Sequence, residues 1–385
     1  MRNAGSAYRP TRWIDGYGLL LVLMILAYFN LVAWVVAALL EFTVEISGRS
    51  TLHEPPWLAA YAAYLCGAVP VLAQWLTHAL QGVLGLVTAR YDDASDDGFE
   101  LSRQTYPELY AIVGKLARQV HAPPPDRLFA SPLAECYVAE RRRFALFPDR
   151  QLILVVGLPH LAVLQVGDLT AILAHELAHF RRGDTRLGVF CSRFLQTLGR
   201  WVELAGRRRL HYIDPLYWLA RGYFAVFLRL LVPLRRQQEF RADYWSARVC
   251  GGPAAADALL REWVVARQFE TVVAAPAASD KRAGETIYDR LTRRWRALSP
   301  AGLSYLEGRL WQTESSPAFA SHPTLAERVA AMRSLPPLDP PDPTPARVLL
   351  RDFPRVAARL QALFDELGDG QHAAPVPLGT RCACR

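Results

Sequence analysis

Two imidazoles and a carboxylate occur at helical spacing in the run His175-Glu176-Leu177-Ala178-His179. Residues i and i+4 of an α-helix lie on one face, so His175 and His179 can reach one ion, and Zn²⁺ prefers such nitrogen ligands. Glu176 is rotated by about 100° around that helix, which places it beside the metal's open position. A carboxylate there can act as general base for water, so the run predicts metal-assisted hydrolysis. The alternative is two helix-surface histidines, but the flanking residues are apolar, and burying unpaired polar groups among them is costly.

A catalytic zinc needs a third protein ligand, and the best candidate is Glu239 in Gln237-Gln238-Glu239-Phe240-Arg241-Ala242-Asp243. Glu239 and Asp243 are again i, i+4, so one helix face can offer a ligand and a carboxylate that orients a ligating histidine. The alternative is a surface acid on a charged helix. We adopt that interpretation for Glu203 and Glu262 and favour ligation for Glu239.

These residues give the chain a resemblance to the M48 family of integral-membrane zinc metallopeptidases. That family includes the bacterial heat-shock membrane protease type and the eukaryotic CAAX prenyl protease type. The resemblance extends from about Glu100 to Met332, and its motifs are His175 to His179, Asp184, Glu239 to Asp243 with Ala247, and Ser321-His322-Pro323-Thr324-Leu325-Ala326-Glu327-Arg328. It implies one Zn²⁺ per chain held by His175, His179 and Glu239, with Glu176 as catalytic base and Asp243 orienting a zinc-bound histidine.

The resemblance also implies a His and an Arg near the reacting water, which correspond to His322 and Arg328. An imidazole N–H or a guanidinium could stabilise the oxyanion that develops at a peptide carbonyl. The alternatives are a loop residue for His322, which precedes a proline, and a structural salt-bridge partner for Arg328.

The edge strand ahead of the zinc helix is where a substrate backbone is thought to add as an extra strand in this family. The family usually has an Asn-Ala-type segment there, whereas this chain has Ala134-Glu135-Cys136-Tyr137. We therefore expect Glu135 at the substrate side, with an altered subsite preference. The following Arg141-Arg142-Arg143 is either the rim of that cleft or a solvated, membrane-facing turn, and we favour the turn.

Two apolar runs near the N-terminus predict membrane spans. The chain is uncharged from Tyr17 to Leu40, and a helix needs about 20 residues to cross a bilayer. A second span is expected from Trp57 to about His78. A cleaved signal peptide is the alternative for the first run, but its apolar core would be only about 7–15 residues long. Three arginines precede the first run and one lies between the two, so the positive-inside rule places residues after 90 on the cytoplasmic side.

The expected organisation is a membrane anchor over 1–90, a zinc metallopeptidase domain over 91–335, and a Pro-rich linker, short helix and flexible tail over 336–385. Within the domain we expect a surface helix to Val120, strands at Arg127–Phe129, Cys136–Val138 and Gln151–Gly157, and a helix from Leu169 to about Arg181 capped by Asp168. Residues 188–234 are apolar in patches interrupted by arginines, which predicts an interfacial helical hairpin and no further clean span. The fold class is mainly α with a small β-sheet, an α+β zincin-like metalloprotease domain, plus two N-terminal transmembrane helices.

The composition excludes other classes of protein. With 52% hydrophobic and 21% charged residues, the 385-residue chain is too apolar to be disordered. Its net charge of +8 comes almost wholly from arginines, since Lys115 and Lys281 are the only lysines. We attribute that bias to a GC-rich coding genome and expect no nucleic-acid partner. The six cysteines lack disulfide-framework spacing, which favours a reduced compartment.

These features together predict a membrane-anchored, zinc-dependent endopeptidase of the bacterial inner membrane with a cytoplasmic catalytic domain. Its expected partners are the lipid bilayer and protein or peptide substrates, above all membrane proteins in quality control or processing. One alternative is a proteolytically inactive, chaperone-like membrane protein that uses the cleft only for binding. Another is a specialised prenyl-peptide processing protease.

Overall fold

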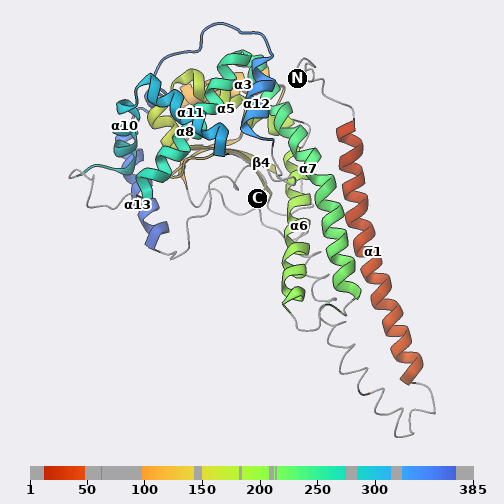
Figure 1. Ribbon diagram of the computed structural model, residues 1–385. Coiled ribbons are helices and arrows are strands. Elements are labelled where there is room, and N and C mark those ends of the chain that lie inside the picture. Colours follow the sequence, from red (N-terminus) through yellow and green to blue (C-terminus); the bar gives the residue numbers. More distant parts are fainter. Residues whose placement is uncertain are drawn as a thin grey trace.

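The computed structural model describes residues 13–47, 62, 98–142, 150–181, 184–207, 212, 215–274, 284–313 and 323–369. Helices form most of this part of the chain, and a four-stranded mixed sheet accompanies them, which confirms the mainly helical class with a small sheet. Figure 1 shows a globular unit that contains the sheet, and a bundle of long helices that extends away from it. The helices of the globular unit include α3 (Pro107–Gln119), α4 (Leu158–Val163), α5 (Val166–His179), α8 (Gly252–Ala274), α10 (Ile287–Ala297), α11 (Pro300–Thr313), α12 (Leu325–Arg333) and α13 (Phe353–Asp369).

The sheet has the order β1-β2-β4-β3, so β3 is an edge strand within the described residues. The strands are β1 (Phe99–Glu100), β2 (Arg127–Ser131), β3 (Cys136–Arg142) and β4 (Arg150–Gly157), with β2 parallel to β4 and β3 antiparallel to it. The three predicted strands are confirmed. The turn expected at Arg141-Arg142 is wrong, because Arg141 pairs with Gln151 and Arg142 with Arg150 in the ladder.

One face of the sheet packs against helix α5 in the main hydrophobic core. Leu128, Leu154 and Val156 of the sheet and Leu173 and Leu177 of α5 are all fully buried in this core. Alternate residues of each strand point to one face, which explains why these strand side chains share a side. The zinc-motif helix is therefore held on a rigid platform, with edge strand β3 in contact with it.

Helix α5 begins earlier than the sequence suggests. Its N-cap is Gln165, and Asp168 lies within the first turn, where its carboxylate accepts the backbone N–H of Gln165 at 3.4 Å. Asp168 also pairs with Arg261 of α8 at 2.5 Å. The prediction of Asp168 as the N-cap is thus wrong, because this carboxylate reaches back from inside the helix. The helix ends at His179, with Phe180 as its C-cap.

The bundle consists of α1 (Trp13–Ser47), α6 (Asp184–Gly206) and α7 (Pro215–Cys250), which lie side by side in Figure 1. Apolar side chains from all three form a core separate from that of the globular unit, among them Ile25 of α1, Phe194 of α6 and Phe227 of α7. The hairpin predicted over 188–234 corresponds to α6 and the first part of α7. Helix α7 then continues into the globular unit, so a single helix joins the two parts.

Among the described residues, one helix, Tyr217–Cys250, is long and apolar enough to cross a membrane. In its most apolar 18-residue segment, 33% of the residues are buried inside the protein. We expected no span there, but between Trp218 and Leu234 only Arg221 and Arg229 are charged. The first predicted span falls within α1, where Leu19–Trp34 is a shorter apolar helix. The second, Trp57 to His78, lies outside the described residues except for one position.

Residues 336–369, which the sequence analysis set apart as a linker and short helix, pack against the globular unit. Thr344 accepts the backbone N–H of Val166 at 2.7 Å, and Leu164 accepts that of Ala346 at 2.9 Å. After the 3-10 helix Ala346–Leu349, α13 buries Val356 and Leu360 completely in the main core. The predicted flexible tail lies beyond residue 369, outside the described residues.

Candidate metal centre

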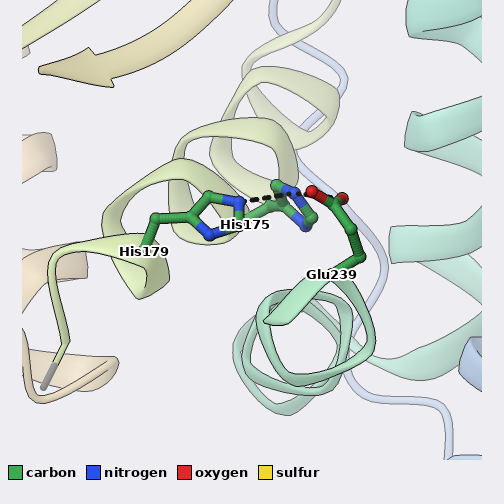
Figure 2. A group of neighbouring side chains, drawn as sticks. All are labelled: His175, His179 and Glu239. Carbon is green, nitrogen blue, oxygen red and sulfur yellow. Dashed lines mark hydrogen bonds and ion pairs between the residues drawn. The ribbon is translucent and has the colours of Figure 1, made fainter. Parts of the chain in front are cut away.

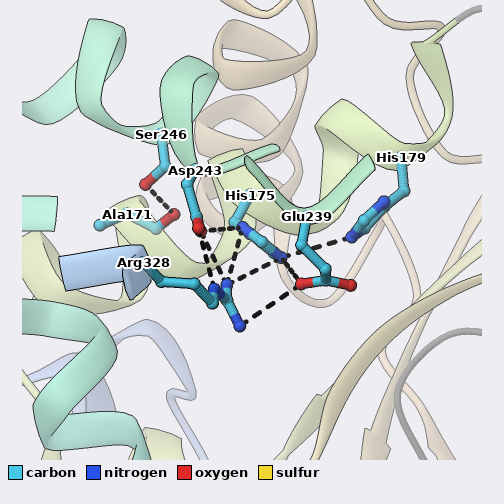
Figure 3. Close-up of polar contacts among 7 residues, drawn as sticks. All are labelled: Ala171, His175, His179, Glu239, Asp243, Ser246 and Arg328. Atoms are coloured by element: carbon cyan, nitrogen blue, oxygen red, sulfur yellow. Dashed lines mark hydrogen bonds and ion pairs between the residues drawn. The ribbon is translucent and has the colours of Figure 1, made fainter. Parts of the chain in front are cut away.

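Helices α5 and α7 approach each other closely at the site. The hydroxyl of Ser246 in α7 donates to the carbonyl oxygen of Ala171 in α5 at 2.7 Å (Figure 3). Ala171 precedes His175 by one turn, and Ser246 follows Asp243 by three residues, so this bond fixes how the two helices face each other. The small side chains of Ala171 and Ala247 are both buried where the helices meet.

This contact brings together the three residues predicted as metal ligands (Figure 2). The Nε2 atoms of His175 and His179 are 3.3 Å apart, and Nε2 of His175 is 3.6 Å from Oε2 of Glu239. One ligand atom from each residue lies within 4.8 Å of the others, so the group could hold one metal ion. His179 is 7% exposed and Glu239 4%, so these polar groups are largely shielded from water.

Asp243 and Arg328 form a second layer around His175 (Figure 3). Oδ1 of Asp243 is 3.0 Å from Nδ1 of His175, and the same carboxylate accepts two bonds from Arg328, from Nε at 2.8 Å and from Nη2 at 2.7 Å. Nη1 of Arg328 is also 3.4 Å from Oε2 of Glu239. The arginine therefore links Asp243 and Glu239, and through Asp243 it acts on the orientation of the His175 ring.

The electrostatics of the group favour an added positive charge. Burial alone would lower the pKa of His175, but its hydrogen bonds with Asp243 and Glu239 outweigh burial and raise the pKa to about 10. Burial, helped by the charge of His175, lowers the pKa of His179 to about 4. The site thus stabilises a proton on His175, beside Glu239, and keeps the His179 imidazole neutral. These properties fit a divalent cation, which displaces the proton when it binds.

Glu176 lies on α5 directly after His175 and is 4% exposed. Burial raises its pKa to about 8, the charge of His175 opposes this, and the charges of Glu262 and Glu239 add to it. Its Oε2 atom is buried and has no hydrogen-bond partner among the described residues. A buried carboxylate of this kind beside a cation site has the character of a general base or acid.

The remaining predicted site residues have different outcomes. Arg328 lies beside the metal group, where it forms ion pairs with Asp243 and Glu239. These contacts correspond to the salt-bridge alternative for this residue. His322 lies outside the described residues. Glu135 directly precedes edge strand β3, and its Oε1 atom accepts a hydrogen bond from the Ser131 hydroxyl at 3.1 Å.

Three buried or half-buried polar residues near the site were missed by reasoning from the sequence. Arg241 is 5% exposed, and its charge contributes to the lowered pKa of His179. The Sγ atom of Cys136 in β3 lies 3.8 Å from Nδ1 of the fully buried His160. Glu262 of α8, which we interpreted as a surface acid, is half-buried, and its charge acts on Glu176. The sequence did contain an indication for Arg241, because it lies between Glu239 and Asp243 in the motif that was used to predict the third ligand.

Comparison with known proteins agrees with this geometry. The sequence profile described as peptidase family M48 matches residues 104–335, which include the whole described metal group. Proteins named Protease HtpX homolog are similar over parts of the chain: one from Gemmatimonas aurantiaca is 26% identical over 245 residues, which is 61% of this chain and 78% of that protein. The corresponding protein of Aquifex aeolicus is 24% identical over 210 residues, 50% of this chain and 64% of that protein.

A third such protein, from Desulforapulum autotrophicum, is 26% identical over 191 residues, 45% of this chain and 59% of that protein. The chain thus spans less than two thirds of two of these curated relatives. No solved structure matches the chain. Because the family profile covers more than half of the sequence and includes the described group of two histidines and a glutamate, the chain belongs to peptidase family M48.

Proposed function

We propose that this chain is a zinc-dependent endopeptidase that hydrolyses peptide bonds of protein substrates. The observation that supports this most strongly is the convergence of His175, His179 and Glu239, with one ligand atom from each within 4.8 Å of the others. Two histidines and a glutamate are a ligand set used by catalytic zinc, which keeps its fourth position open for water. Glu176 supplies the carboxylate that this chemistry needs.

Zinc in such a site supplies a Lewis acid that lowers the pKa of water and polarises the scissile carbonyl. Glu176 accepts the proton that the attacking water loses and returns it to the leaving nitrogen as the C–N bond breaks. It is buried, and its Oε2 atom has no hydrogen-bond partner in the part of the chain that the structure describes, which leaves this carboxylate available for both transfers. His322 is proposed to stabilise the oxyanion, and Glu135 to contact the substrate.

Arg328 acts, in this proposal, as a positioning residue. Two of its nitrogens are engaged by Asp243 at 2.8 and 2.7 Å, and the third lies 3.4 Å from Glu239. The role expected for it at the oxyanion would require breaking these contacts. Asp243, held in this way, keeps one ring nitrogen of His175 engaged and so leaves the other for the metal.

Replacing Arg328 with Gln is expected to weaken zinc affinity about 10–100-fold, because Asp243 and Glu239 lose their shared cation. Arg328→Lys should recover only part of this affinity, since an ammonium cannot form the paired bonds. Competition with a chelator measures the affinity, and KM for a peptide should change little. Arg333→Gln is the control, because Arg333 is on the same helix, half exposed, and pairs with Asp257. If Arg328→Gln left zinc affinity intact and raised KM alone, a substrate contact would replace the positioning role.

Membrane anchoring through the bundle is part of the proposal. Large apolar side chains of α1 are exposed, including Leu19, Leu23, Leu26 and Trp34, at 52 to 67%. Exposed apolar surface of this kind favours lipid contact, and the arginine distribution favours a cytoplasmic catalytic unit of the inner membrane. Carbonate washing of bacterial membranes should leave the chain in the pellet, whereas release into the supernatant would contradict anchoring.

The direct test of the proposed activity uses the purified full chain in detergent with unfolded casein. Cleavage into peptides that stops on addition of a zinc chelator is the expected result. Binding of casein without cleavage would instead support a chaperone-like protein that uses the cleft only for binding. Membrane-protein quality control is tested by identifying proteins captured in membranes by the Glu176→Gln variant.

A further inference from the structure

Residues 336–346, which we call the strap, run across the starts of helices α5 and α8. The strap contains six prolines and lies beyond residue 335, where the match to the family profile ends. It follows α12, the helix that carries Arg328, and reaches the start of α5, the helix that carries His175 and His179. A segment outside the family match therefore contacts the helix that supplies two of the predicted metal ligands.

The strap accepts backbone hydrogen bonds from the start of α5. The first N–H groups of a helix have no carbonyl partner within that helix, so they need one from elsewhere. The N–H of Val166, the first residue of α5, donates to the carbonyl oxygen of Thr344 at 2.7 Å. The N–H of Gly167 donates to the carbonyl oxygen of Asp342 at 2.9 Å. These N–H groups point along the helix axis, so their bonds oppose a shift of α5 along that axis.

The same segment is fixed to the start of α8 and the end of α12. The N–H of Gly252, the first residue of α8, donates to the carbonyl oxygen of Pro336 at 3.0 Å. A Cβ atom at Gly252 would lie 2.2 Å from the carbonyl oxygen of Met332 and 2.5 Å from that of Leu335, so the backbones are in close contact. Helix α8 packs against both α5 and α12. The strap thus bridges three helices around the metal group.

The strap lies so close to α5 that a side chain at Gly167 does not fit. A Cβ atom there would lie 2.5 Å from Cβ of Pro341 and 2.9 Å from the backbone nitrogen of Asp342. Non-bonded carbon atoms pack at about 3.5–4.0 Å, so a methyl group would push the strap and the helix apart. The next residue of α5, Asp168, pairs with Arg261 of α8 at 2.5 Å and holds the helix on the other side of this contact.

The register between α5 and α12 matters for the metal group. Arg328 of α12 donates to Asp243 at 2.8 and 2.7 Å, and Oδ1 of Asp243 is 3.0 Å from Nδ1 of His175 on α5. A shift of α5 along its axis would lengthen the contact between Asp243 and His175. Because the strap connects the end of α12 to the start of α5 and is stiffened by prolines, it limits this shift.

We propose that the strap is a positioning element of the metal centre, which keeps His175 in register with Asp243 and Arg328 by binding the start of α5. Gly167 is its positioning residue, because its lack of a side chain allows the strap to reach the helix. The strap acts on zinc affinity through α5 and takes no part in bond breaking. This inference rests on the proposed zinc-dependent function.

The test compares Gly167→Ala with the wild-type full chain in detergent. In the metal-free chain, hydrogen exchange of the N–H groups at 166 and 167 should be slow in the wild type and clearly faster in the variant. The dissociation constant for zinc, measured by competition with a chelator, should rise about tenfold, the lower end of the range for groups that orient metal ligands. The control is Gly308→Ala on α11, where a Cβ atom would meet nothing within 4 Å.

Removing the opposing atom separates the contact from other effects of the substitution. The double variant Gly167→Ala/Pro341→Gly lacks the Cβ atom nearest to the new methyl group, so its zinc affinity should return toward that of Pro341→Gly alone. Pro341→Gly adds no atom and loosens the strap, which should speed exchange at 166 and 167 about two- to fivefold. This variant also tests the inference if Gly167→Ala does not fold.

A merely structural strap predicts a different pattern. In that case Gly167→Ala would lower Tm and speed exchange, while zinc affinity stayed equal to that of Gly308→Ala, and the positioning role would be wrong. Exchange at 166 and 167 that is unchanged in both Gly167→Ala and Pro341→Gly would likewise overturn the inference. Either result leaves the proposed function intact, whereas a wild-type chain that binds no zinc refutes that function and this inference with it.

Discussion

Replacing Glu176 with Gln is expected to lower kcat/KM for peptide hydrolysis by about a thousandfold, because general acid–base catalysis contributes in this range. The amide has nearly the same shape as the carboxylate but cannot accept the proton of the attacking water. Since Glu176 is not among the three residues that could share an ion, the variant should still bind about one zinc per chain. Elemental analysis together with peptide kinetics measures both quantities on one sample.

The matched control for this variant is Glu203→Gln on α6. Glu203 has a side chain that is 63% exposed and pairs with Arg207, the residue directly after α6, so its loss should leave activity unchanged. Full activity of Glu176→Gln would show that the proton is accepted elsewhere. A parallel loss of zinc and activity would instead make Glu176 part of metal binding.

Replacing Glu239 with Ala should abolish both zinc binding and hydrolysis. The variant leaves two histidines one turn apart, and catalytic zinc normally has three protein ligands. Glu239 is 4% exposed and its Oε2 atom contacts Arg328 at 3.4 Å, so its removal also leaves a buried guanidinium with one partner fewer. The zinc content per chain after dialysis should fall from about one to background, and kcat/KM should fall at least about a thousandfold.

Arg248→Ala provides the control for Glu239→Ala, because Arg248 is exposed and lies on the same helix α7. Unchanged circular dichroism of Glu239→Ala would show that the loss of zinc is not a consequence of unfolding. Retention of both zinc and activity would mean that another residue supplies the third ligand.

The predictions that agree with the structure came from the spacing of residues close together in the sequence. His175 and His179 share a helix, as do Glu239 and Asp243, so the i, i+4 rule places each pair on one face without knowledge of the tertiary structure. The strand-like segments Arg127–Phe129 and Cys136–Val138 and the apolar run Gln151–Gly157 likewise predicted β2, β3 and β4 close to their actual positions. Such features depend on a few neighbouring residues, which is why they can be inferred from the sequence.

Features that depend on distant packing could not be inferred in the same way. The bonds between Arg328 and Asp243 join residues 85 positions apart and exist only because α12 packs against α7. The Pro-rich segment suggested a linker, yet its carbonyl groups accept backbone N–H groups from the start of α5 and of α8. Prolines remove donors but keep acceptors, so composition alone could not distinguish a packed segment from a free one.

Glu262 lies between these two cases. The repeat of small and apolar residues in α8 is present in the sequence, but we interpreted Glu262 as a surface acid and did not use the repeat, whereas the structure shows this glutamate half-buried. What the sequence could not provide was the relation of this residue to Glu176 and Cys136, which depends on how α8 packs on α5.

Titration of zinc into the metal-free full chain tests the central claim most directly. Hydrolysis of a fluorogenic peptide should be absent without metal, rise in proportion to added zinc and reach its plateau at about one ion per chain. X-ray absorption at the zinc edge of the same sample should show two imidazole nitrogens and carboxylate oxygen at about 2.0–2.2 Å. Full hydrolysis by the metal-free chain, or a zinc spectrum without imidazole ligands, would contradict the account.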